Sequence, residues 1–143
     1  MKLRKSKEID ELCYTFIYEH LYLCDYEIHT DAICRQVGAL IAAMPEDCGD
    51  IRSELEHLQP IIYHLNGSIR GKCAVSEEDQ QWLLARYRAH KEQTKDCLCG
   101  FVLPRGDPPV GQLNAVSSDA KKAIRLMVRI HKEEGREIPD VLH

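Results

Sequence analysis

Apolar residues recur at helical spacing over most of the chain, and this period restricts the fold to packed helices. The clearest apolar stripe consists of Leu113, Val116, Ala120, Ala123, Met127 and Ile130. Its members are three or four positions apart, so they share one face of a helix. Nowhere do apolar and polar residues alternate as they would in a half-buried strand. The sequence therefore predicts an all-α helical bundle of about five helices joined mostly by short connections.

Capping and breaking residues set the expected boundaries. Asp50 and Ser76 are expected N-caps, because their short side chains can accept hydrogen bonds from a first helical turn. Pro60 should kink the third helix, since proline lacks a backbone donor. Gly135 should end the last helix, and 138–140 should begin a turn that is too short to be stable unless another segment completes it. The expected helices are 9–24, 31–43, 50–69, 76–96 and 110–134.

Composition narrows the class of protein. A chain of 143 residues is expected to form a single domain, 1–143, around one core. A net charge of -4 argues against a general nucleic-acid binder. The sequence has no apolar run of the ~18 residues that a membrane span needs, and its N-terminus lacks the apolar core of a signal peptide. We therefore expect a cytoplasmic protein that binds neither nucleic acid nor membrane.

The chain contains seven cysteines, which we expect to be reduced thiols. Cys97 and Cys99 are spaced CxC, which does not match the CxxC redox motif. Cys13, His20 and Cys24 would share one face of the first expected helix, where they could ligate a metal ion. The alternative is that they are small core residues, because free cysteine is among the most buried residue types.

A proline- and glycine-rich loop leads into a strongly basic helix. Lys121 and Arg125 would lie one turn apart with Lys122 beside them, where lysine and arginine can bind phosphate oxygens. The rigid loop would hold Phe101 in a fixed relation to these cations, which suits a ligand with one apolar and one anionic part. Two alternatives stay open: the cations form a solvated helix face, and Phe101 closes the end of the core.

The stretch FVLPRGDPPVGQLNAVSSDAKKAIR, residues 101–125, resembles the signature of a known family. It is similar to that of the propanediol-utilisation type of ATP:cob(I)alamin adenosyltransferase. In that family Phe-Ile/Val-Leu-Pro-Gly-Gly-x-Pro precedes an arginine-rich helix. The likeness extends back through EEDQQWL, IIYHLNGSI and TDAICRQVGALIAAM, which aligns Asp31 and Gly38 with the family's aspartate and glycine. It covers 30–142 and leaves 1–29 as a divergent N-terminal region.

The resemblance implies a homotrimer of helical bundles with sites between subunits. The enzymes transfer the 5′-deoxyadenosyl group of ATP, bound with Mg²⁺, to reduced cobalamin and release triphosphate. By this match Phe101 faces the corrin and helps to keep the lower axial position of cobalt empty. Lys121, Lys122 and Arg125 align with arginines that bind the triphosphate, and Asp31 has a polar role. A corrinoid-dependent enzyme is a further expected partner.

The chain also departs from the family pattern. Ser117 replaces the arginine that pairs with the aspartate, Ile124 replaces a glutamate, and Arg105 replaces a motif glycine. The sequence lacks the family's N-terminal ATP loop and its last helix. We therefore advance the hypothesis of a circular permutation, in which the expected helix over 9–24 occupies the position of that last helix.

Three functions follow from these patterns. The first is a corrinoid adenosyltransferase. The second is a non-catalytic corrinoid-binding or assembly protein that has lost the ATP loop. The third is a metal-binding helical protein that uses Cys13, His20 and Cys24.

Overall fold

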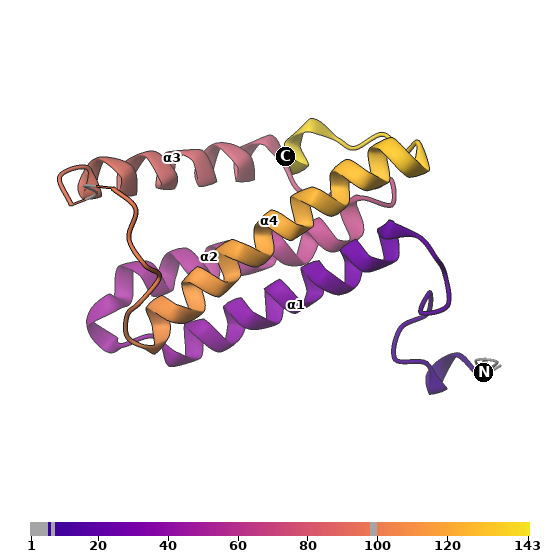
Figure 1. Ribbon diagram of the computed structural model, residues 1–143, viewed down its shortest axis with the longest axis horizontal. Coiled ribbons are helices and arrows are strands. Elements are labelled where there is room, and N and C mark those ends of the chain that lie inside the picture. Colours follow the sequence, from indigo (N-terminus) through magenta and orange to yellow (C-terminus); the bar gives the residue numbers. More distant parts are fainter. Residues whose placement is uncertain (1–5, 7, 98–99) are drawn as a thin grey trace.

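A computed structural model describes residues 6, 8–97 and 100–143 of the chain. The described residues form helices and turns and contain no strand, which confirms the predicted all-helical class. The model has four α-helices rather than about five (Figure 1). They are α1 (Tyr22–Ala43), α2 (Gly49–Ser68), α3 (Glu77–Thr94) and α4 (Pro108–Glu134), with short 3-10 turns η1 (Ile9–Glu11), η2 (Glu46–Cys48) and η3 (Asp140–Leu142).

Helices α1, α2 and α4 form the core, with α1 packed between the other two. Their buried faces carry the apolar stripes expected from the sequence, including Val37, Leu40, Met127 and Ile130. The core therefore depends on the burial of aliphatic side chains along α1.

Within the described part of the chain, no helix is both long enough and apolar enough to cross a membrane.

The turn between α1 and α2 is held by side chains from α2. Arg52 donates hydrogen bonds to the carbonyls of Ile41 (3.0 Å) and Met44 at the end of α1, where helical carbonyls lack partners within the helix. Farther along the pair, Gly38 allows close approach: an added Cβ would lie 2.6 Å from Nε2 of Gln59. Gln59 in turn donates to the carbonyl of Cys34 (3.2 Å). These contacts fix the packing of α2 against α1.

Two contacts join the start of α1 to the end of α4. The backbone N–H of Tyr22, in the first turn of α1, donates to the carboxylate of Glu134. The guanidinium carbon of Arg129 lies 3.8 Å from the centre of the Tyr22 ring, within the range of a cation–π interaction. Gly135 then ends α4 in the left-handed conformation, with φ of 65°, as predicted. The two helices are thus tied at the end where α1 begins.

Helix α3 lies outside this core (Figure 1). Ser76 and Asp79 form a reciprocal capping box at its start, which confirms Ser76 as the N-cap. All of α3 is described, and none of its residues is buried. It contacts α2 through the stacked rings of His57 and Trp82, 4.1 Å apart, and through Glu54, which accepts from His90 at 2.6 Å. Side-chain contacts at the surface therefore hold α3.

The expected N-terminal helix over 9–24 is wrong. Residues 12–21 form bends and turns, and α1 begins at Tyr22, nine residues before the expected start at Asp31. Tyr14 and Phe16 instead contact Glu27 and Arg70, a pair that no helical period encodes. No helix is therefore available in this segment to replace the family's missing last helix, and the permutation hypothesis fails.

The remaining boundaries lie close to those expected. Asp50 lies within the first turn of α2 rather than capping it, because the helix begins at Gly49. Helix α2 continues through Pro60 without interruption. After Gly135, Leu142 of η3 packs into the core. The turn after residue 138, which we expected to need another segment for stability, is thus held in part by its own Leu142.

Candidate functional site

Two depressions flank α1, each with a volume of about 600 Å³. The α1/α4 groove lies between α1 and α4, and the α1/α2 cavity lies between α1, the end of α2 and residues 13–17. Such volumes suit small-molecule ligands. The two depressions differ in charge. Of the predicted site residues, Asp31 lines the α1/α2 cavity, and Lys122 and Arg125 line the α1/α4 groove.

Cations dominate the α1/α4 groove. Helix α4 contributes Lys122, Arg125 and Arg129 at successive turns, with Leu126 between them. Helix α1 contributes its opposite wall, which consists of Asp25, Ile28, His29 and Ala32. Three cations on one helix face, opposite a wall with the single carboxylate of Asp25, form a surface that can bind an anion.

Asp119 organises the end of this groove. It accepts hydrogen bonds from Lys122 (2.7 Å) and from Gln36 of α1 (3.1 Å), while its backbone carbonyl accepts from Nε2 of His29 (2.8 Å). The hydrogen bonds from Lys122 and Gln36 hold the pKa of Asp119 below its usual range. Asp119 therefore stays ionised and holds the ammonium of Lys122 at one side of the groove.

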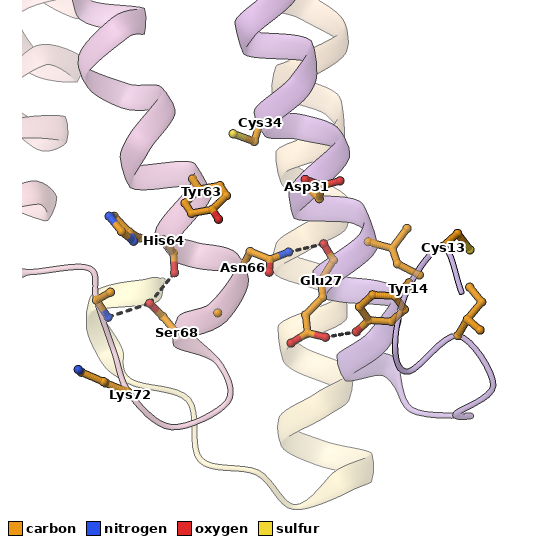
Figure 2. A pocket seen from close by; sticks show the side chains of 14 residues that line it. Cys13, Tyr14, Glu27, Asp31, Cys34, Tyr63, His64, Asn66, Ser68 and Lys72 are labelled. Atoms are coloured by element: carbon orange, nitrogen blue, oxygen red, sulfur yellow. Dashed lines mark hydrogen bonds between the residues drawn. The ribbon is translucent and has the colours of Figure 1, made fainter. Parts of the chain in front are cut away.

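The buried Glu27 lines the α1/α2 cavity (Figure 2) and forms an ion pair with Arg70. Glu27 is only 5% exposed, and Arg70 contacts both of its carboxylate oxygens, with Nη2 2.7 Å from Oε2. The phenol of Tyr14 donates to the same carboxylate. Burial, and then this bond to Glu27, raise the pKa of the Tyr14 phenol well above its ordinary value. The backbone carbonyl of Glu27 is also satisfied, by Asn66 at 2.5 Å.

The predicted cationic cluster is brought together only in part. Lys122 and Arg125 both line the α1/α4 groove, whereas Lys121 is exposed and lines neither depression. Arg129 was not among the predicted phosphate-binding residues, although it lies one turn beyond Arg125 on the same basic helix.

Phe101 lies apart from these cations. Its side chain is fully exposed and lines neither depression, so the alternative that it closes the core is wrong. The loop that carries it runs to the start of α4 at Pro108 (Figure 1). Arg125 lies more than four turns farther along that helix, about 25 Å along its axis. A single chain therefore does not place the Phe101 ring beside the guanidinium of Arg125.

Asp31 is likewise separate from the cations. It lines the α1/α2 cavity and forms an exposed ion pair with Arg35, at 2.8 Å, on its own helix. Lys122 and Arg125 lie in the other depression. Asp31 and the cationic groove therefore occupy two different faces of the protein.

The weak metal candidates are not gathered into a site. Cys13 and His20 are exposed in the turns before α1, whereas Cys24 is buried within its first turn. In the described part of the chain, no three His, Cys, Asp or Glu side chains are arranged to hold a metal ion. The core interpretation therefore holds for Cys24 but not for Cys13. Cys99 lies outside the described residues.

Sequence reasoning also missed Glu27, Arg70 and Tyr14. They are separated by up to 56 positions and come from three segments, so no local motif reveals them. The only signal is Glu27 itself, an acidic residue among the buried positions of α1.

The fold and the groove define a helical bundle with a cationic surface groove. Comparison with protein families, curated proteins and solved structures gave no significant match. Support for a function therefore comes from the resemblance over 101–125 and from the geometry of the two depressions.

Proposed function

We propose that the chain is a corrinoid adenosyltransferase, which transfers the 5′-deoxyadenosyl group of ATP to reduced cobalamin and releases triphosphate. The main support is the environment of Phe101. This residue, Val102 and Leu103 are all exposed just before the cationic helix α4. An exposed apolar run is typical of a surface that a ligand or partner covers. This agrees with the resemblance over 101–125.

The active site in this proposal forms between copies of the chain in a cytoplasmic homotrimer. Phe101 lines neither depression, whereas Arg125 lines the α1/α4 groove, and this argues against a site within one subunit. A site shared between subunits would combine Phe101 of one copy with the α1/α4 groove of another. The groove then binds the triphosphate part of ATP, and the exposed ring covers the corrin.

The chemistry assigns a separate role to each part. Phe101 would pack on the corrin and exclude a lower axial ligand, which makes the cobalt easier to reduce to the Co(I) nucleophile. That nucleophile attacks C5′ of the ribose, and the bond from C5′ to the triphosphate oxygen breaks. Lys122 and Arg125, with Lys121 nearby, would stabilise the negative charge that develops on the leaving triphosphate. Mg²⁺ would enter bound to the phosphates of ATP.

A visible absorption titration with cob(II)alamin tests the proposal. We expect a shift to the four-coordinate spectrum only when Mg²⁺-ATP is present, and loss of that shift in Phe101→Ala. Ile124→Ala, which truncates an exposed apolar residue of α4, should retain the spectral shift. The absence of any response to the corrinoid would contradict the proposal.

Mixing variants tests whether the site is shared. Phe101→Ala and Arg125→Ala should each be inactive alone, because each copy lacks one half of every site. Co-refolded mixtures should recover activity, since some interfaces then combine the intact Arg125 of one copy with the intact Phe101 of another. Activity that does not recover on mixing would place both residues in one subunit.

A second candidate is a non-catalytic corrinoid-binding protein that serves a corrinoid-dependent enzyme. The exposed pair of Asp31 with Arg35 favours it, because Asp31 here has a partner remote from the phosphate groove. A corrinoid spectral change that is independent of ATP would support this candidate over the enzyme.

A further inference from the structure

The segment before α1 crosses the α1/α2 cavity without joining the helical core. Residues 12–21, here called the strap, are exposed or half-buried throughout. Two of their backbone hydrogen bonds close local turns, from Ile17 N–H to Tyr14 (3.1 Å) and from Glu19 N–H to Phe16 (2.9 Å). Cys13, Tyr14 and Ile17 of the strap form one wall of the cavity. The strap thus contributes to the cavity but adds no buried residue to the core.

Two aromatic side chains attach the strap to the bundle. Tyr14 donates to the buried carboxylate of Glu27 (Figure 2), and its oxygen lies 3.5 Å from Nη2 of Arg70. The guanidinium carbon of Arg70 also lies 4.0 Å from the centre of the Phe16 ring. One buried ion pair, Glu27 with Arg70, therefore receives both rings. This attachment is localised, so its loss would release the strap.

The accessibility of the Cys24 thiol indicates whether the strap is closed. It lies in the first turn of α1 and is only 3% exposed. Its thiol lies 3.7 Å from the Glu19 carboxylate of the strap. Burial raises the pKa of this thiol. Release of the strap would expose it.

We propose that the strap is a hinged cover that opens the α1/α2 cavity while α1, α2 and α4 stay folded. Local opening should require far less free energy than global unfolding, because the strap itself contributes no buried residue. With the strap open, the cavity of about 600 Å³ loses the wall formed by Cys13, Tyr14 and Ile17. The cover thus controls entry of small molecules to a site separate from the α1/α4 groove. This inference does not rest on the proposed function.

Alkylation of Cys24 by iodoacetamide, followed by peptide mass spectrometry on the full chain, tests the cover. The double variant Tyr14→Phe, Phe16→Ala removes both attachments and keeps Glu27 paired with Arg70. A hydrogen bond to a charged group and a cation–π contact together correspond to an increase in the open population of about tenfold or more. We expect Cys24 to be alkylated faster by that factor.

Ile130→Val is the matched control, because it trims the core without touching the strap. Such a truncation raises the population of the globally unfolded chain by about two- to tenfold. If the strap opens locally, Ile130→Val leaves the alkylation rate of Cys24 unchanged. Acceleration in Ile130→Val equal to its effect on global unfolding would overturn the proposal, since Cys24 would then react only in the unfolded chain. An unchanged rate in the double variant would also overturn it.

Discussion

Arg70, just past the end of α2, pairs with both carboxylate oxygens of Glu27 in the first half of α1. The carboxylate is 5% exposed, whereas the guanidinium remains one-third exposed on its other side. A charge buried in this way is costly unless it is paired. The pair therefore makes the α1–α2 contact dependent on one cation.

Replacing that cation should destabilise the fold. Arg70→Met leaves the buried Glu27 carboxylate without a cation, and we expect the free energy of unfolding to fall by about 2 kcal/mol, reduced from the fully buried case because Arg70 is partly exposed. Urea unfolding measures this change. Arg35→Met removes the exposed partner of Asp31 and should cost less than about 1 kcal/mol. Equal effects of the two substitutions would contradict the importance of burial.

Ser76→Ala should loosen α3 alone. Loss of an N-cap costs about 1 kcal/mol of helix stability, and α3 buries no residue that could compensate. Amide hydrogen exchange should therefore accelerate in α3 while α1 and α4 keep their protection. Ser53→Ala, which removes a hydroxyl within α2, is the control. Faster exchange throughout the chain would show that α3 supports the core.

Ile130→Ala should test the seam between α1 and α4. Ile130 is completely buried, so truncation leaves a cavity and should cost about 3 kcal/mol of unfolding free energy. Ile124 lies on the same helix and is 44% exposed, so Ile124→Ala should cost clearly less. Thermal unfolding of both variants distinguishes them. Similar losses would mean that Ile124 is also covered in the assembled protein.

Stability should fall in alkali because of Tyr26. Burial raises the pKa of its phenol from about 10 to about 12 in the folded chain. Between these values the unfolded chain loses the proton and the folded chain retains it, so the unfolding free energy decreases as pH rises. The loss should reach about 3 kcal/mol near pH 12. Urea unfolding across this range should show a shallower decline in Tyr26→Phe, and no such change in the exposed control Tyr63→Phe.

The sequence predicts α3 and α4 well because local signals define them. Ser76 caps the one, and an apolar stripe followed by Gly135 defines the other. The apolar stripe from Ile9 to Cys24 is equally helical in spacing, yet α1 begins only at Tyr22. Before Tyr22, contacts of Tyr14 and Phe16 with Arg70, more than 50 positions away, override the local preference for a helix. Periodicity contains no information about such distant partners.

The same reason limits prediction of the candidate site. Lys122 and Arg125 share a helix face, so their spacing suffices to predict that they line one groove. Asp31 depends on which side of α1 faces α2, which tertiary packing decides. Phe101 is an apolar residue in a loop, and only the three-dimensional structure distinguishes an exposed ring from one that closes the core.

A helix without buried residues places few constraints on its own sequence. Most single substitutions in α3 should leave the core of α1, α2 and α4 intact, because its principal contacts are Trp82 with His57 and two basic side chains with Glu54. In a saturation-mutagenesis library selected only for folding, α3 would tolerate far more substitutions than α1. Sequence drift would therefore be fastest between the two halves of the chain that carry the core.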